Sequence, residues 1–367
     1  MRSLYQRIKK YIPTWVLIIY LITLISAIVY ALCAFSVIFA DFINNFCAPI
    51  RAVFSVVTSV VPFFIFEILI LISPILFVLL IIFAVKSAYK SKEASIRFIS
   101  YIVAFFCCYF ISFVWTIASG YYTTPIEKKM DLELDYITKN EIYDTTILLS
   151  HDLNRLSRKI KYDKNGSSVM GYSYLELSEK ISQAYKDLSK NKSFPHTFDS
   201  KIKPIVLSVP ITYANISGIY IPLTAEAGVN TNYSDFVIAS TSAHEMAHQR
   251  GVARESETSF VSFLALYNSG DSYLKYSAEL DACSRLLLSL KKEDINLYNK
   301  AIAQIDNKVI TDYNNHITHN KKYSSSSILE ASNTINNSYL QVNGEVDGIK
   351  SYDKVSSLIC AYFTSKY

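Results

Sequence analysis

Two histidines four positions apart are the residues of this sequence best suited to chemistry, in the stretch His244-Glu-Met-Ala-His248. In an α-helix, residues i and i+4 project from the same face, so both imidazoles can reach a single metal ion. Glu245 lies beside that face. Zinc lowers the pKa of a bound water from about 15.7 to about 7, and a neighbouring carboxylate can accept the proton. The spacing therefore predicts a zinc site, with Glu245 as the catalytic base.

A third ligand is expected after the helix that carries the two histidines. A catalytic zinc ion takes three protein ligands and keeps one position open, and the candidates are Glu255 and Glu257. Gly251 permits a sharp turn that brings the next helix back. The two glutamates lie about 200° apart around a helix, so only one of them can bind. We favour Glu255, with Glu257 as the alternative, because Ser259 one turn later can hydrogen-bond to the ligands.

The HExxH pattern is short, and it also occurs by chance in helices that bind no metal. Here the small neighbours Ala243 and Ala247 permit close packing, and acidic residues follow on a second predicted helix, which favours a metal site. Arg250 and Arg254 are interpreted as partners of Glu257, as ligands of a substrate carboxylate, or as solvated side chains. The remaining histidines lie in polar stretches and are interpreted as surface residues: His151, His196, His316 and His319.

The segment before the motif predicts a strand that positions a substrate. Residues 216–224 are rich in β-branched and aromatic side chains and contain Pro222, which is typical of an edge strand. Residues 203–210 are predicted to form β-structure as well. An exposed strand edge can hold an extended peptide by backbone pairing, as zincin peptidases do. Glu226 and Asn230 follow the first of these segments, where they either line a substrate cleft or cap the following loop.

Helices account for most of the remaining residues after Gly120. Ser234 and Asp235 form an N-cap signal for the helix that carries the motif. Apolar residues recur at helical spacing in several other segments. These segments are 132–156, 172–189, 254–267, 273–290 and 352–363. We therefore expect residues 121–367 to form one α+β, mostly helical, zincin-like domain with a small sheet.

The first 120 residues predict a membrane anchor with three spans. A bilayer core needs roughly 20 apolar residues in a helix. Three segments satisfy this requirement, at about 12–36, 66–86 and 98–119. The first is too long for a cleavable signal peptide and is interpreted as an uncleaved anchor. The segment 42–66 is interrupted by Arg51 and Pro62, so it is interpreted as a re-entrant or interfacial helix.

Basic side chains predict the orientation of this anchor in a bacterial cytoplasmic membrane. The N-terminal tail has four basic and no acidic residues, and the loop between the second and third spans has four basic residues and Glu93. Both are expected in the cytoplasm, so three crossings place residues 121–367 outside. Residues 1–120 carry nine basic and three acidic side chains, and the remainder carries 27 and 28. A nearly neutral outer domain gives no reason to expect nucleic-acid binding.

The cysteines argue against a thiolate metal site, and they leave open whether the chain forms a disulfide. The sequence has no CxxC pair, so a thiolate zinc site is not expected. Cys283 and Cys360 are the two cysteines of the outer domain. A disulfide between them is compatible with a compartment outside the cytosol, and the sequence alone does not decide whether they pair.

The sequence resembles a family of bacterial membrane proteins catalogued as domain of unknown function 3810. The resemblance covers nearly the whole chain and rests on the three spans and on four blocks. These are GYYTTPIE from Gly120, ISGIYIPLTAEAGVN from Ile216, HEMAHQRGVARESE from His244 and YLQVNGEVDG from Tyr339. It implies a membrane-anchored zinc metallopeptidase of gluzincin type, without an established substrate. It also implies that Glu255 binds zinc, and Ser259 stands where that pattern has a longer Asn or Asp.

The leading hypothesis is a membrane-anchored, zinc-dependent endopeptidase that hydrolyses a peptide or protein substrate. His244, His248 and Glu255 would hold the Zn²⁺, and Glu245 would activate the water. The alternative is a non-catalytic membrane sensor or assembly factor that keeps the fold to bind a peptide or a cell-wall component. Glu245 favours the enzyme, because a metal kept only for structure has no use for that carboxylate. An oxyanion-stabilising residue cannot be singled out among the 28 tyrosines.

Overall fold

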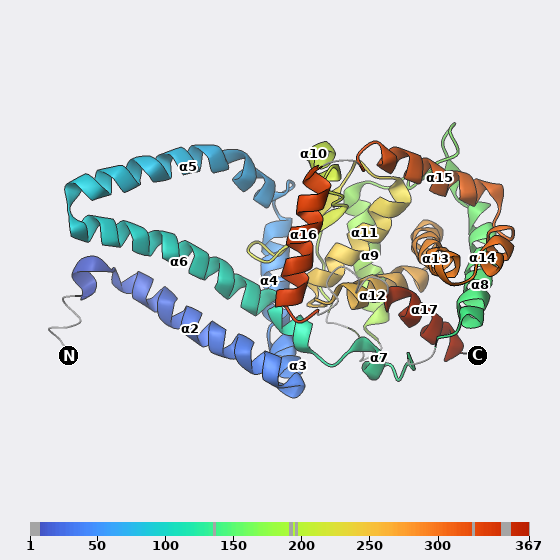
Figure 1. Ribbon diagram of the computed structural model, residues 1–367, viewed down its shortest axis with the longest axis horizontal. Coiled ribbons are helices and arrows are strands. Elements are labelled where there is room, and N and C mark those ends of the chain that lie inside the picture. The colour runs from blue at the N-terminus through green and yellow to red at the C-terminus, as the bar shows by residue number, and fades with distance from the viewer. Residues whose placement is uncertain are drawn as a thin grey trace.

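The computed structural model describes residues 8–134, 137–190, 194, 197–324, 327–345 and 354–366. Two parts are evident, a group of long apolar helices and a mostly helical body with a small sheet (Figure 1). The apolar helices come from the N-terminal third of the chain. This arrangement agrees with the predicted membrane anchor followed by a mixed, mainly helical domain.

Three long helices project together from the body (Figure 1). They are α2 (Thr14–Phe35), α5 (Ile65–Lys90) and α6 (Lys92–Thr116). Most ends of the predicted spans lie within a few residues of the ends of these helices. The described N-terminus and the turn between α5 and α6 lie at the same far end of the group (Figure 1). The basic segments of the sequence are thus at one end and the body is at the other.

The number of candidate spans differs from the prediction. Among the described residues, four segments are long and apolar enough to cross a membrane, and the sequence predicted three. The additional segment is Val37–Ser59, which consists of α3 (Val37–Phe46) and α4 (Ala48–Ser59). Its composition meets the criterion although Arg51 lies inside it. However, α4 runs across the direction of the three long helices and packs on the body (Figure 1).

Polar contacts show how closely α4 and the start of α5 are joined to the body. The Ser55 hydroxyl donates to the carbonyl of Ala225 at 3.1 Å, and the backbone N–H of Lys201 donates to Ser59 Oγ. The buried Arg51 guanidinium bonds to Asn44 and to a carbonyl of α6. These bonds satisfy polar groups that would be unsatisfied in hydrocarbon. The segment between the first two long helices is therefore part of the body's framework.

Helices α11 (Asp235–Gln249), α12 (Glu255–Tyr267) and α13 (Ser272–Glu293) pack against one another at the centre of the body. Their apolar side chains form one core with those of the surrounding helices. The surrounding helices are α7 (Ile126–Lys129), α8 (Lys139–Ser157), α9 (Tyr174–Leu188), α14 (Ile295–Ile302), α15 (Asn307–Lys321) and α17 (Lys354–Thr364). The helices predicted from apolar spacing are confirmed, with boundaries that shift by several residues.

The principal sheet has the strand order β3-β5-β4. Strand β3 (Ile202–Ile205) pairs parallel with β5 (Glu226–Asn230), and β4 (Gly218–Ile221) pairs antiparallel with β5. The predicted edge strand is thus confirmed as β4, which ends just before Pro222. A second small sheet pairs β1 (Lys161–Tyr162) with β2 (Ser168–Val169).

One β prediction was wrong in its second half. Residues 203–210 were predicted as β-structure, but the strand ends at Ile205 and a short helix, α10 (Ser208–Thr212), follows. The Ser208 hydroxyl donates to the carbonyl of Ile205 and accepts from the N–H of Thr231, which closes the turn between strand and helix. Such side-chain bonds favour turns over the continuation of a strand.

Candidate metal centre

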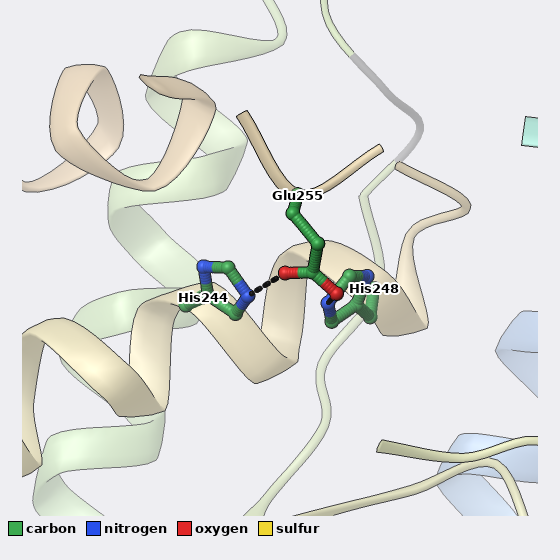
Figure 2. A group of neighbouring side chains, drawn as sticks. All are labelled: His244, His248 and Glu255. Atoms are coloured by element: carbon green, nitrogen blue, oxygen red, sulfur yellow. Dashed lines mark hydrogen bonds and ion pairs between the residues drawn. The ribbon is translucent and has the colours of Figure 1, made fainter. Parts of the chain in front are cut away.

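The two histidines of the motif lie one turn apart on α11, and Glu255 at the start of α12 reaches between them (Figure 2). Its carboxylate oxygens lie 3.0 Å from His244 Nε2 and 3.6 Å from His248 Nε2. The three ligand atoms all lie within 4.8 Å of one another. The turn after α11 produces this convergence, because Gly251 has a φ of +87° that favours glycine.

The other nitrogen of each imidazole has a partner that orients the ring. His248 Nδ1 lies 2.8 Å from the carbonyl oxygen of Val252, an acceptor, so this nitrogen carries a proton and Nε2 is the atom left to face Glu255. His244 Nδ1 lies 3.2 Å from the Ser259 hydroxyl, which is one turn after Glu255 on α12. Both rings therefore direct Nε2 to the same point.

These residues fit a zinc ion in donor type, and the two histidine–glutamate pairs also fit in spacing. Two donors at about 2.0–2.2 Å from a tetrahedral zinc ion lie roughly 3.4 Å apart. The two histidine–glutamate distances, 3.0 Å and 3.6 Å, bracket that separation. Two neutral imidazoles and one carboxylate are also a ligand set of catalytic zinc sites that keep one position open. The site could therefore hold zinc through His244, His248 and Glu255.

The electrostatics of the site favour a positive charge at that point. Burial opposes protonation of His248, but the Glu255 carboxylate outweighs it and raises the pKa of His248 to about 9. Burial also acts to raise the pKa of Glu255, and the two imidazoles hold that pKa well below its ordinary value. The Glu255 carboxylate that stabilises a proton on the buried imidazole would stabilise a metal cation at the same place.

Glu257 lies on another side of α12 and binds elsewhere. Its carboxylate forms an ion pair of 2.5 Å with Arg254 and accepts a hydrogen bond from the backbone N–H of Ile126 at 3.2 Å. It is buried beside these partners and is not among the grouped ligand atoms. Of the two glutamates considered from the sequence, Glu255 lies at the histidines, whereas Glu257 is held in an ion pair with Arg254.

A family model described as "Protein of unknown function (DUF3810)" matches residues 42–360. The chain belongs to this family. The match includes the strands, the HExxH helix and the chain from the second half of α3 through α6, and it confirms the family that the sequence resembles. No curated protein and no solved structure matches the chain. Because the family description states no activity, the chemistry of the DUF3810 site is argued from its geometry.

A cleft of about 1080 Å³ opens over the three ligands of this DUF3810 chain. Strand β4 forms one wall and α16 (Ser327–Val342) contributes another. Glu245 lies in the cleft, largely buried, and burial raises the pKa of its carboxyl against the opposing effect of the two imidazoles. The motif thus lies at the floor of a cleft large enough for a segment of polypeptide.

Three tyrosines beside the ligands were not singled out by the sequence. The ring of Tyr220 stacks on His248 at a centroid distance of 6.3 Å. The hydroxyl of Tyr121 donates to that of Tyr339 at 3.1 Å, and both side chains line the cleft. All three lie in blocks that carry the family resemblance, which is the signal that would have selected them. Tyr121 and Tyr339 are candidates for an oxyanion-stabilising hydroxyl, whereas the hydroxyl of Tyr220 is buried.

Glu345 is a further residue that the sequence did not single out. Its carboxylate accepts from the backbone N–H of Glu255 at 2.9 Å, at the first residue of α12. An acidic group at a helix N-terminus interacts favourably with the helix dipole and with the free N–H groups there. Glu345 therefore holds the backbone that carries the third ligand.

Glu226 and Asn230 do not line the cleft. Glu226 is buried, accepts from the backbone N–H groups of Ile65 and Phe66, and pairs with Lys203 at 2.5 Å. Asn230 donates to the carbonyl of Ile216 and accepts from the backbone N–H of Asn232. The proposed role in substrate binding is therefore not supported for either residue, and both stabilise local backbone structure.

The remaining candidates also have structural partners. Arg250 is buried between the rings of Tyr185 and Phe198 and donates to two carbonyls. His316 is partly buried, and burial lowers its pKa to about 4, so it is not the solvated surface residue expected. His196 lies outside the described residues.

The two cysteines of the body are unpaired in the structure. Cys283 and Cys360 are both buried and both are free thiols. Burial raises the pKa of each to about 12, so neither is a reactive thiolate at neutral pH.

Proposed function

We propose that this chain is a membrane-anchored, zinc-dependent endopeptidase with a zincin-like body. The observation that carries the proposal is the convergence of two imidazoles and the Glu255 carboxylate next to Glu245, at the floor of a cleft bordered by a strand edge. When bound by these ligands, zinc supplies a Lewis acid that polarises a peptide carbonyl and makes water nucleophilic near neutral pH.

Glu245 is the residue of the chain that moves protons in this reaction. It directly follows the first histidine on α11, so its carboxylate lies beside the ligand atoms at the floor of the cleft. It accepts the proton of the attacking water on a carboxylate oxygen and returns it to the nitrogen of the leaving amine. Burial raises the pKa of Glu245, which brings it closer to the working pH of a general base and acid.

Strand β4 orients the substrate by backbone pairing. Asn230 N–H donates to Ser217 O at 2.9 Å, so this residue pair is hydrogen-bonded. Such pairs alternate along an antiparallel ladder, so Ile219 also bonds to β5, and the backbone groups of Gly218 and Tyr220 face away from the sheet. The outer edge of β4 borders the cleft. An extended peptide can add there as a further strand.

The proposed location is a bacterial cytoplasmic membrane, with the N-terminus in the cytoplasm and the body outside. The basis is the distribution of basic residues. The turn between α5 and α6 lies at the end of the helix group farthest from the body (Figure 1), and Lys10 pairs with Glu93 beside that turn. A body outside the cytoplasm would meet peptide or protein substrates there.

The test uses the full chain purified in detergent. Zinc content and hydrolysis of a casein peptide mixture are measured for the wild type, Glu245→Gln and His244→Ala. We expect zinc in the wild type and in Glu245→Gln, hydrolysis by the wild type alone, and loss of both properties in His244→Ala. Equal hydrolysis by the wild type and Glu245→Gln would remove Glu245 from the mechanism. Bound zinc without hydrolysis in the wild type would favour a sensor or assembly factor.

A further inference from the structure

The cleft points to the class of substrate. We infer that the substrate is a polypeptide anchored in the same membrane, cut a few residues from the point where it leaves the bilayer. This inference rests on the proposed peptidase function and adds the origin of the chain that is cut. It is based on three features of the cleft, namely its continuity with α6, the course of β4 and the exposed apolar side chains of α16.

The cleft extends from the ligands onto the apolar helices. Its lining includes Phe66 at the start of α5, and Tyr109 and Ile117 from α6 and its C-terminal end. Tyr109 precedes the last residue of α6, Thr116, by seven residues, which corresponds to about 10 Å along a helix. The cleft therefore reaches back along a candidate membrane span and is not confined to the body's outer surface.

Strand β4 connects the reaction site to that helix. At its first residue, Gly218, the strand lies against Glu245. Just beyond its last residue, the carbonyl of Pro222 accepts a hydrogen bond of 2.6 Å from Ser112 of α6. The four residue steps from Gly218 to Pro222 span about 13 Å in a strand. A peptide paired along β4 thus passes from the membrane end of the body to Glu245 in four to six residues.

The wall formed by α16 carries exposed apolar side chains beside the polar Ser332, Asn333 and Asn336. Ile328, Ile335 and Tyr339 recur at helical spacing on its cleft side, and Ile335 is 70 % exposed. Tyr339 contacts Phe113 of α6 through their rings, so these apolar side chains continue to the helix group. A soluble peptide would not need exposed apolar side chains that lead to a span. The segment of a membrane protein next to its own span is rich in apolar and aromatic residues.

The lining differs in charge between the helix group and the body. Phe66, Tyr109 and Ile117, from the helix group and its end, are uncharged, whereas the body contributes the ion pair of Asp281 with Arg285. A chain that leaves a bilayer changes in the same direction, from its apolar span to its solvated portion. This match favours a substrate that enters the cleft from the membrane side.

The experiment uses the full chain reconstituted in phosphatidylcholine vesicles and three matched probes. The tethered probe is an apolar helix of about 20 residues followed by about 15 randomised residues, which extend roughly 50 Å. The soluble probe has the randomised residues alone. The spacer probe has about 20 Gly and Ser residues between the helix and the randomised part. Mass spectrometry records the rate and the position of cleavage.

We expect the tethered probe to be cut at least tenfold faster than the other two, four to six residues after its helix. Ile335→Asp should remove this preference, whereas Val342→Asp should not, because Val342 is 78 % exposed on α16 and does not line the cleft. Equal rates for tethered and soluble probes would overturn the inference and leave the peptidase function intact. Equal rates for tethered and spacer probes would overturn it as well.

A second readout does not depend on catalysis. In Glu245→Gln, a photoreactive phenylalanine derivative in place of Ile335 should crosslink the tethered probe at least tenfold more than the soluble one. If no probe is cut by the wild type, the peptidase function fails, and the crosslinking ratio still decides the origin of the bound chain. Equal crosslinking of both probes would contradict a membrane-anchored partner.

Discussion

Gly218 of β4 lies directly against Glu245 of α11. A β-carbon added at Gly218 would lie 2.8 Å from Glu245 Oε1 and 2.5 Å from the Thr241 methyl group. No side chain fits there without movement of the helix or the carboxylate. The close approach of the strand edge to the proposed general base therefore depends on glycine at this position.

The first prediction concerns this contact. Gly218→Ala should lower kcat/KM for peptide hydrolysis at least tenfold, because a displacement of about 1 Å in a catalytic group has effects of that size or larger. Zinc content should remain unchanged, since the atoms nearest to the added β-carbon belong to Thr241 and Glu245 and not to the three ligands. The measurements are zinc content and initial rates. Gly270→Ala is the matched control, because nothing lies within 4 Å of a β-carbon there. Full activity in Gly218→Ala would show that the contact is not required.

The second prediction separates the two glutamates of α12. Glu255→Gln should weaken zinc binding by at least tenfold, because a neutral amide replaces the only anionic ligand of the group. Glu257→Gln should keep zinc but lose the charge of its ion pair with Arg254, which lowers the free energy of unfolding by roughly 1–3 kcal/mol. Metal titration and thermal unfolding measure the two effects. A Glu257→Gln protein without zinc would reverse the assignment.

The sequence predicted the two histidines, the following glutamates and the edge strand, because these depend on local spacing. Helical periodicity alone left the choice between Glu255 and Glu257 open. The choice is decided by contacts between residues distant in sequence. The backbone N–H of Ile126 donates to the Glu257 carboxylate, and the Glu345 carboxylate accepts from the backbone N–H of Glu255.

The membrane segment shows the same limit. The composition of Val37–Ser59 could not predict that this segment packs on the body. Its polar side chains Arg51 and Ser55 bond to carbonyls of α6 and of the turn between β4 and β5, which are distant in sequence. Likewise, the position of Glu226 after the predicted strand left two interpretations open, a cleft residue or a cap of the following loop. The partners of Glu226 are the start of α5 and Lys203, which periodicity does not bring together.

The third prediction tests whether the start of α5 belongs to the framework of the body. Glu226 is buried with Lys203 and accepts from two N–H groups of α5. Glu226→Gln leaves the Lys203 ammonium buried without an anionic partner at this position, a change that destabilises by about 3–5 kcal/mol. The protein should unfold at a clearly lower temperature in detergent. Asp187→Asn, in an exposed ion pair with Lys190, is the control and should change stability by less than about 1 kcal/mol.

If Glu226→Gln and Asp187→Asn unfolded at the same temperature, the bonds between α5 and the sheet would not stabilise the body. The proposed integration of anchor and body would then be wrong. The same integration explains why the tests above use the full chain, because a chain without α4 and the start of α5 would leave Glu226 and the face of β5 uncovered.

The fourth prediction concerns pH. Glu279 of α13 is fully buried, with Lys275 Nζ 3.6 Å away, and that ammonium also pairs with Asp152 at 3.0 Å. Burial, followed by the Asp152 carboxylate, raises the pKa of Glu279 from 4.5 to about 8, against the opposing effect of Lys275. The folded state therefore favours the protonated acid. The stability that this proton supplies is complete below the unfolded pKa and is lost as the pH rises from 4.5 through 8.

Glu279→Gln replaces the acid by a neutral group of similar shape that does not titrate. Near about pH 5 the variant and the wild type should unfold at similar temperatures, and near about pH 9 the variant should be more stable. The difference should grow by roughly 1.4 kcal/mol for each unit by which the pKa is raised. Thermal unfolding of both proteins across this range measures it, with Glu330→Gln at an exposed position as the matched control. A pH-independent difference for Glu279→Gln would mean that Glu279 is ionised in the folded protein, with Lys275 as its effective counter-ion.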